Sequence, residues 1–227
     1  MLKFSLLIKR IFDILMSCVT LILFSPIFLI ISILIKLDSK GPVIFKQGRR
    51  GKDGKVFQMY KFRSMVVGAE KAEMGLFNYA NDSRVTHIGR KLRDTSLDEL
   101  PQLINILKGD MSFVGPRPAV TYELGEFETL NKRYRKRFEV LPGITGLAQV
   151  SGRNEINWDK KVDYDNKYID LFQKVGIWID IKILFQTFIK VIKHSDIYEE
   201  KLDESLSDKD SAKMMEDLVI KRAHEPD

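Results

Sequence analysis

The chain has 227 residues, of which 44% are hydrophobic and 30% charged, enough for one folded domain with an appendage. The net charge is +6, but residues 199–227 carry ten acids against five bases, which leaves +11 on the rest. This basic body predicts an anionic partner: a nucleotide, phosphate, nucleic acid or an anionic membrane surface. The single cysteine, Cys18, excludes an internal disulfide and fits a reducing compartment, in a packing role.

An apolar run occupies Ile11 to Ile35 and is long enough for a transmembrane helix. Pro26 lies in its middle and predicts a kink or break, with Ser25 placed to satisfy the freed backbone. The two arms would measure about 22 and 13 Å at ~1.5 Å per residue. Neither arm alone crosses a hydrocarbon core of ~30 Å. The run is too long for a signal peptide, and no cleavage site follows it.

Both flanks of the apolar run are basic, and basic flanks favour the cytoplasmic side of a membrane. A helix–break–helix that enters and leaves the same leaflet satisfies both flanks, and a kinked single span is the alternative. These features alone do not separate the two. Asp13 follows Lys9 and Arg10 by one turn, so a local ion pair at the membrane edge is expected.

The next segment predicts a β-hairpin: two β-rich runs, "PVIFKQ" and "KVFQMYKFRS", flank a Gly/Lys/Asp turn. Further helices are expected over "RKLRDTSLDELPQLINILKG", "YELGEFETLNKRYRKRF", "WDKKVDYDNKYIDLF" and the amphipathic "WIDIKILFQTFIKVIKHS". The last of these either packs on the core or lies in a membrane interface. These elements give an α+β class: a membrane segment over residues 1–36, a mostly helical domain over 37–198, and an acidic, mobile tail over 199–227.

Two adjacent acids, Asp98 and Glu99, stand in "TSLDELPQ". Read alone, Ser96 and Glu99 fit a capping box, and acids favour the first turn of a helix. Pro101 restricts the pair to a helix start. Arg90, Lys91 and Arg93 precede the pair, and "GPRP" holds Arg117 between two prolines.

Such surroundings suit phosphate chemistry. A carboxylate kept ionised by a helix N-terminus and arginines is a workable nucleophile toward phosphorus. The same environment binds a phosphate. A second carboxylate can act as a base or hold Mg²⁺.

Several segments occur here in an order that resembles the small monotopic polyprenol-phosphate phosphoglycosyl transferases, the bacterial sugar transferase family. They are the run broken at "SP", "GPVIFKQGRRG", "YKFRSM", "TSLDELPQLINILKGDMSFVGPRP", "LPGITGLAQVSGRN" and "KVDYDNKYI". The resemblance covers about Ile8 to Lys193. It implies a re-entrant membrane helix bent at Ser25–Pro26, which favours re-entry over a kinked span.

The resemblance implies transfer of a sugar 1-phosphate from a UDP-sugar to polyprenol phosphate, commonly undecaprenol phosphate, with release of UMP. This step initiates bacterial capsule, exopolysaccharide or glycoconjugate synthesis at the cytoplasmic face of the inner membrane, and the resemblance names other enzymes of the polysaccharide pathway as candidate partners. Nucleic acid is not expected as a partner. The nucleophile position falls on Asp98, which would also hold Mg²⁺, and its carboxylate partner on Glu99. The phosphate-binding positions fall on Arg93 and Arg117, and further site positions on Lys61, Arg63, Arg153 and Asp165.

Two alternatives stay open from the residues. One is a membrane-bound glycosyltransferase that moves the sugar alone and releases UDP. The other is a non-enzymatic basic scaffold that binds lipid headgroups or nucleic acid through "KRYRKR", although Tyr134 is the only stacking aromatic in that cluster. The sequence does not name the sugar, the polymer or the oligomeric state.

Overall fold

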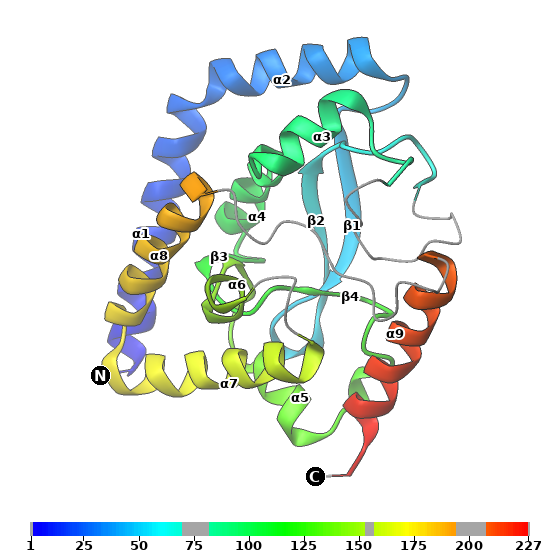
Figure 1. Ribbon diagram of the computed structural model, residues 1–227. Helices are drawn as coiled ribbons and strands as arrows, with labels where there is room; N and C mark the ends of the chain where they lie inside the picture. The colour runs from blue at the N-terminus through cyan, green and yellow to red at the C-terminus, as the bar shows by residue number, and fades with distance from the viewer. Residues whose placement is uncertain (1, 70–81, 153–156, 194–207, 227) are drawn as a thin grey trace.

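The computed structural model describes residues 2–69, 82–152, 157–193 and 208–226 (Figure 1). A β-hairpin stands at the centre, and helices surround it. Helices α1 and α8 run along one side, α2 crosses one end, and α7 and α9 lie near the other. The helices are α1 (Leu2–Leu23), α2 (Ser25–Asp38), α3 (His87–Asp94), α4 (Gln102–Lys108), α5 (Lys132–Lys136), α6 (Leu147–Ser151), α7 (Trp158–Val175), α8 (Trp178–Lys193) and α9 (Asp208–His224). The strands are β1 (Ile44–Arg50), β2 (Val56–Phe62), β3 (Ser112–Val114), β4 (Ala119–Val120) and β5 (Gly143–Thr145).

The apolar run forms a bent helix pair, as the sequence predicts. Helices α1 and α2 meet at 62°, and Pro26 lies in the first turn of α2. Pro26 cannot donate to the carbonyl of Ile22, and the Ser25 hydroxyl donates to that carbonyl instead, at 2.8 Å. Within the described residues, no single helix has the length and apolar composition to cross a membrane, whereas the bent pair together passes that test.

Polar residues of α1 dock the bent pair onto the rest of the molecule. The buried Lys9 ammonium donates to Asp180 of α8 at 2.6 Å and to the carbonyl of Val114 at 2.9 Å. Arg10 donates to two carbonyls in the last turn of α4, at 2.6 and 3.0 Å. Asp13 accepts from the Phe113 amide at 3.1 Å. The expected ion pair within α1 is therefore wrong, because these groups find partners on α4, β3 and α8.

The expected hairpin is confirmed. Strands β1 and β2 pair antiparallel from Ile44 opposite Phe62 to Arg50 opposite Val56. A short 3₁₀ turn (Lys52–Gly54) joins them, with the left-handed backbone at Asp53 and Gly54 that a tight turn requires. Strand β4 pairs with the far end of β1, and β3 pairs in parallel with β5 in a second sheet. The first sheet thus has the order β2–β1–β4, with β1 between the other two strands.

The helix expected over "YELGEFETLNKRYRKRF" is wrong in its length. Gly125 has a φ of 72°, which interrupts any helix there. A 3₁₀ turn (Phe127–Thr129) precedes α5, a short helix capped by the Asn131 side chain, and a second 3₁₀ turn (Arg137–Glu139) follows α5. The break lets Tyr134 and Phe138 reach the core beside α7.

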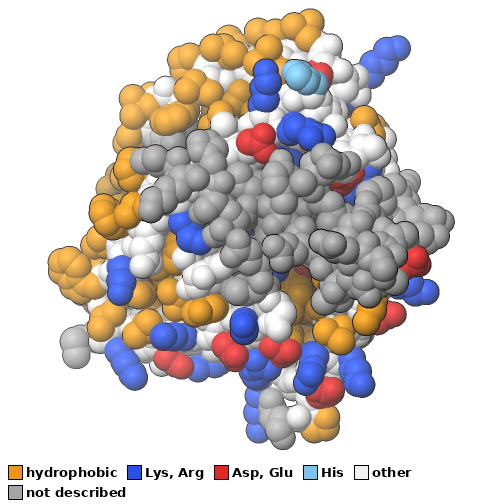
Figure 2. All heavy atoms as spheres, in the orientation of Figure 1, with side chains coloured by type: hydrophobic (Ala, Val, Ile, Leu, Met, Phe, Trp, Pro, Cys, Tyr) orange, Lys and Arg blue, Asp and Glu red, His pale blue; other side chains and the backbone are white. Residues whose placement is uncertain are grey.

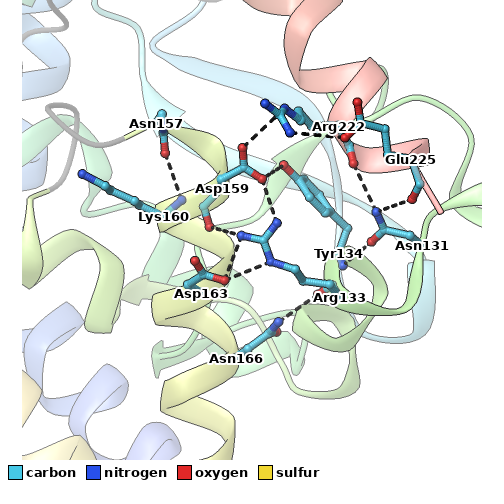
Figure 3. Close-up of polar contacts among 10 residues, drawn as sticks. All are labelled: Asn131, Arg133, Tyr134, Asn157, Asp159, Lys160, Asp163, Asn166, Arg222 and Glu225. Atoms are coloured by element: carbon cyan, nitrogen blue, oxygen red, sulfur yellow. Dashed lines mark hydrogen bonds and ion pairs between the residues drawn. The ribbon is translucent and has the colours of Figure 1, made fainter. Parts of the chain in front are cut away.

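The acidic tail differs from the mobile segment that the sequence predicts. Part of it forms α9, which buries Val219 and Ala223 in the same cluster as Tyr134 and Phe138. The His224 ring contacts the carbonyls of Leu124 and Thr129 at 2.9 and 3.0 Å. A polar network continues this contact from α9 to the start of α7, through Arg222, Asp159 and Arg133 (Figure 3). Helix α9 is thus a packed part of the domain, and apolar residues at helical spacing explain why.

Candidate active site

A cavity of about 680 Å³ opens between the hairpin, the acidic pair and helices α6 and α7. This is the size of a typical small-molecule site. Both acids of the pair line it. The other charged residues that line it are Lys46, Arg49, Lys61, Arg63, Arg84, Arg93, Arg117, Glu123, Arg137, Lys161 and Asp165. Basic residues outnumber acidic ones, so the cavity suits an anionic ligand.

The acidic pair lies in a 3₁₀ turn (Leu97–Glu99) that precedes α4, rather than in the first turn of α4 itself. Ser96 before it has a left-handed backbone, with φ of 56°, and its side chain forms no capping hydrogen bond. The capping-box reading is therefore wrong. Asp98 and Glu99 are only 6% and 9% exposed, which is rare for carboxylates that merely cap a helix.

Glu99 holds two cations in place. Its Oε1 accepts from the Lys61 ammonium at 2.8 Å and from the Arg117 guanidinium at 2.9 Å. Lys61 stands near the end of β2 and Arg117 precedes β4, so Glu99 links two segments that lie far apart in the sequence. Glu99 also raises the pKa of the Arg117 guanidinium above its usual value. This carboxylate thus joins two phosphate-binding candidates through charge-assisted hydrogen bonds.

Asp98 is less tightly engaged. Its closest described cation is Lys61, whose Nζ lies 3.6 Å from Oδ2. Burial raises the pKa of the Asp98 carboxyl above its ordinary value, against the opposing charge of Lys61, and neighbouring Glu99 adds to the rise. The sequence predicts that a helix start and arginines favour the ionised form, whereas desolvation is the largest influence on this pKa and acts in the opposite direction. A carboxylate with few partners, at a cavity wall, remains available to react or to bind a ligand.

The two arginines predicted for phosphate binding both reach this cavity. Arg93 projects from the last turn of α3, and its Nε donates to the Ser64 hydroxyl at 2.9 Å. The Arg117 side chain is 41% exposed, and its backbone carbonyl accepts from Arg137 at 2.7 Å. Lys61, Arg93 and Arg117 therefore approach the acidic pair from three separate elements.

Of the remaining predicted site residues, Arg63 and Asp165 line the cavity, and Arg153 is not among the described residues. Arg63 lines the cavity, but its guanidinium donates to the carbonyls of Ser39 and Lys40, both at 2.7 Å. Arg63 therefore fastens the end of β2 to the chain that leaves α2, and a side chain at Gly41 would collide with it. Asp165 lines the cavity from α7.

Asp165 is paired with a residue that the sequence did not single out. The Arg137 guanidinium, 3% exposed, forms an ion pair with the Asp165 carboxylate at 2.9 Å. Burial raises the pKa of Asp165 to about 6, although the charge of Arg137 opposes the rise. Arg137 also stacks 4.9 Å from the Trp158 ring centroid. Because Arg137 belongs to the basic run "KRYRKR", the sequence alone suggests a solvent-exposed charge. The apolar neighbour Phe138 is the one local sign that this part of the run is buried.

The acidic pair is also the candidate binding site for a divalent metal. Among the described residues, no three His, Cys, Asp or Glu side chains converge as a metal cage. Mg²⁺ does not need such a cage, since it is commonly held by one or two carboxylates, substrate phosphates and water. Asp98 is a hard oxygen donor at a cavity wall with one distant cation, so the residues present fit this mode of binding.

Comparison with known proteins agrees with this site. The model of a protein family described as "Bacterial sugar transferase" matches residues 4–194. The chain belongs to the bacterial sugar transferase family. The matched region contains the bent helix pair, the acidic pair and every described residue that lines the cavity, whereas α9 lies beyond it.

Curated members of the family are similar over most of this chain. The UDP-glucose:undecaprenyl-phosphate glucose-1-phosphate transferase of Klebsiella pneumoniae is 45% identical over 199 residues, which are 86% of this chain and 42% of that protein. The undecaprenyl-phosphate galactose phosphotransferase of Salmonella typhimurium is 41% identical, over 86% of this chain and 42% of that protein. The UDP-N-acetylgalactosamine-undecaprenyl-phosphate N-acetylgalactosaminephosphotransferase of Aeromonas hydrophila is 41% identical, over 82% and 44%. The chain thus spans about two-fifths of the length of these relatives, and the three relatives differ in the sugar that their names give.

Proposed function

We propose that this chain transfers a sugar 1-phosphate from a UDP-sugar to polyprenol phosphate, such as undecaprenol phosphate, and releases UMP. The observation that carries the proposal is the buried Asp98–Glu99 pair, set among Lys61, Arg93 and Arg117 in a cavity of ligand size. Relatives named for such transfers share this part of the chain. The product would be the first lipid-linked intermediate of a bacterial polysaccharide or glycoconjugate.

The proposed reaction has two phosphoryl transfers. In the first, an Asp98 carboxylate oxygen attacks the β-phosphorus of the UDP-sugar. The bond from that phosphorus to the bridging oxygen breaks, and UMP leaves with the oxygen and its electron pair. In the second, a phosphate oxygen of the lipid attacks the same phosphorus, the bond to Asp98 breaks, and the carboxylate is regenerated.

The surrounding residues have separate roles in this scheme. Lys61, Arg93 and Arg117 neutralise the phosphate charge, and Glu99 fixes Lys61 and Arg117 at 2.8 and 2.9 Å. The burial that raises the pKa of Asp98 makes the carboxylate less solvated, and hence a better nucleophile once it is ionised. Mg²⁺ would be held by Asp98 together with substrate oxygens, and when bound it supplies neutralisation of the diphosphate charge.

Product analysis tests this proposal directly. The full chain, in detergent with undecaprenol phosphate and Mg²⁺, is given a panel of UDP-sugars labelled in the uracil. UMP release that is lost in Asp98→Asn supports the proposal. UDP release would identify a glycosyltransferase that moves the sugar alone. A scaffold would be identified if the wild type showed no turnover and Asp98→Asn bound lipid as well as the wild type.

The surface of the bent helix pair supports a place at the membrane. Exposed apolar side chains cover α1, α2 and α8, with Ile22, Leu37, Trp178 and Phe185 between 66% and 80% exposed. In Figure 2 they form an almost continuous hydrophobic band along one side and the top, the regions of these three helices in Figure 1. A contiguous exposed apolar surface of this kind is typical of a membrane or protein interaction site. We infer that α1 and α2 enter and leave the same leaflet, while α8 lies in the interface.

Labelling of single cysteines tests this topology. Cys18 is first replaced by alanine, and cysteines are then placed at Lys3 and Lys40. Re-entry predicts that a membrane-impermeant reagent labels both from the cytoplasmic side of the inner membrane. Labelling from opposite sides would refute re-entry and favour a kinked span.

A further inference from the structure

One end of the cavity holds polar groups that the proposed phosphate chemistry does not use. Helices α6 and α7 and the turn after α5 form this end, and Gln149, Arg137, Trp158, Lys161 and Asp165 line it. The opposite end is lined by Pro42 and residues 66–69, which are small or apolar, and by Arg63 and Arg84, which lie beside that segment. The acidic pair belongs to the same cavity. Its two ends therefore differ in chemistry.

Arg137 is fixed in place yet leaves one nitrogen free. Its Nε donates to Asp165 at 3.0 Å, and its Nη2 donates to the carbonyl of Arg117 at 2.7 Å. The guanidinium also stacks on Trp158. Its Nη1 is buried and has no hydrogen-bond partner. A buried donor without a partner costs free energy, and a ligand acceptor would recover it.

Gln149 adds a second unsatisfied group. Both Oε1 and Nε2 of its amide are buried without a hydrogen-bond partner. Arg137 and Gln149 both line this end of the cavity, and together they have two donors and one acceptor without a partner. The charge of Arg137 is balanced by Asp165, so the free Nη1 suits a neutral oxygen better than a phosphate. The unused groups therefore favour a neutral ligand with two acceptors and one donor.

We propose that Arg137 and Gln149 bind the uracil base of the nucleotide sugar. The edge of uracil presents acceptor, donor and acceptor at O2, N3–H and O4, which complements the free Nη1 donor and the Gln149 amide. This inference rests on the proposed function and deepens it by assigning the two ends of the cavity. The base and ribose occupy the polar end, the diphosphate lies at Asp98 and Arg117, and the end near α2, where Arg63 supplies positive charge, receives the lipid phosphate. Arg137 thereby couples base recognition to phosphate binding, because it also holds the Arg117 backbone.

Inhibitor affinities test the assignment. Gln149→Leu removes the amide at similar volume, and Gln149→Glu replaces its donor with an acceptor. Each should raise the inhibition constant for UMP by about 10- to 30-fold, the loss of two buried hydrogen bonds. The inhibition constant for the matching sugar 1-phosphate should stay within about twofold, since that group lies elsewhere. Gln47→Leu is the matched control, because Gln47 lines the cavity on β1 and has Arg49 as its partner.

Calorimetric titration of UMP into the full-length Asp98→Asn protein in detergent repeats the comparison without turnover. Unchanged UMP affinity in both Gln149 variants overturns the assignment. So does an equal loss of sugar 1-phosphate affinity, which would place the sugar at this end. If the wild type releases UMP while the variants bind UMP normally, only the base assignment fails. If the wild type releases no UMP from any donor, the proposed function fails.

Discussion

Replacing Glu99 with glutamine tests the role of the carboxylate that joins Lys61 and Arg117. The substitution keeps the size of the side chain and removes its charge. Wild-type Glu99 accepts two charge-assisted hydrogen bonds, at 2.8 and 2.9 Å, and is 9% exposed. A hydrogen bond to a charged group contributes about 1.5–3 kcal/mol, against about 1 kcal/mol for a neutral one. The two bonds together should therefore lose about 2–3 kcal/mol.

This loss should appear in catalysis. If the positions of Lys61 and Arg117 matter in the transition state, kcat/KM for UMP release falls roughly 30- to 150-fold. A second effect follows from charge, because Glu99 contributes to the raised pKa of Asp98. The acid limb of the pH–rate profile should move to lower pH in Glu99→Gln. A lower pKa leaves Asp98 ionised further into the acid range.

The assay is initial-rate UMP release across pH, with Glu123→Gln as the control. Glu123 lines the same cavity, and its carboxylate accepts from the Val120 amide at 2.8 Å, so this control removes a charge but leaves the hydrogen bonds of Glu99 to Lys61 and Arg117 in place. The control should stay within about threefold of wild type. The proposed role of Glu99 in positioning Lys61 and Arg117 would be refuted by either of two results. One is a kcat/KM of Glu99→Gln within threefold of wild type, and the other is an equal loss of kcat/KM in Glu123→Gln.

Three further predictions concern the supporting structure. Lys9→Met leaves Asp180 buried without its cation and should lower the free energy of unfolding by about 3–5 kcal/mol. The double variant Lys9→Met/Asp180→Leu should recover most of this stability. Chemical denaturation in detergent measures the free energy of unfolding of both variants. Because the pKa of Asp165 is raised from 3.8 to about 6, its protonation stabilises the folded state fully below pH 3.8, and this contribution is lost as pH rises through 6. Acidification through pH 6 should nevertheless raise KM for the UDP-sugar, as the Asp165–Arg137 ion pair is lost, and Asp165→Asn should remove this step from the pH profile of KM. His224→Ala deletes contacts to two backbone carbonyls and should cost about 1–2 kcal/mol, seen as a lower melting temperature.

Each of these predictions has a contradicting outcome. A Lys9→Met/Asp180→Leu protein no more stable than Lys9→Met would show that the pair matters for more than charge balance. A KM that stays flat between pH 5 and 7 would contradict the role of Asp165. For His224→Ala, a melting temperature equal to that of the exposed-site control Lys221→Ala would show that α9 contributes little through its last turn.

The sequence by itself determined the local features of this protein. Pro26 fixed the break between α1 and α2, because proline lacks the amide that a continuous helix needs, and the hydroxyl of Ser25 replaces that donor. The alternating runs on either side of a glycine turn determined the hairpin. The family resemblance assigned Asp98, Glu99, Arg93, Arg117, Lys61, Arg63 and Asp165, and all seven line one cavity, whereas Arg153, which it also assigned, lies outside the described residues.

Only the tertiary structure decided how those residues work. Whether Glu99 caps a helix or holds Lys61 and Arg117 depends on these two side chains meeting at Glu99, a contact between distant segments that no local pattern encodes. Burial, not helix position, sets the pKa of Asp98. The same holds for Arg137, whose surroundings separate it from the other bases of "KRYRKR", and for α9, whose acidic composition hid two residues that complete a core. Local sequence determines backbone preference, whereas desolvation and long-range pairing arise only when the chain has folded.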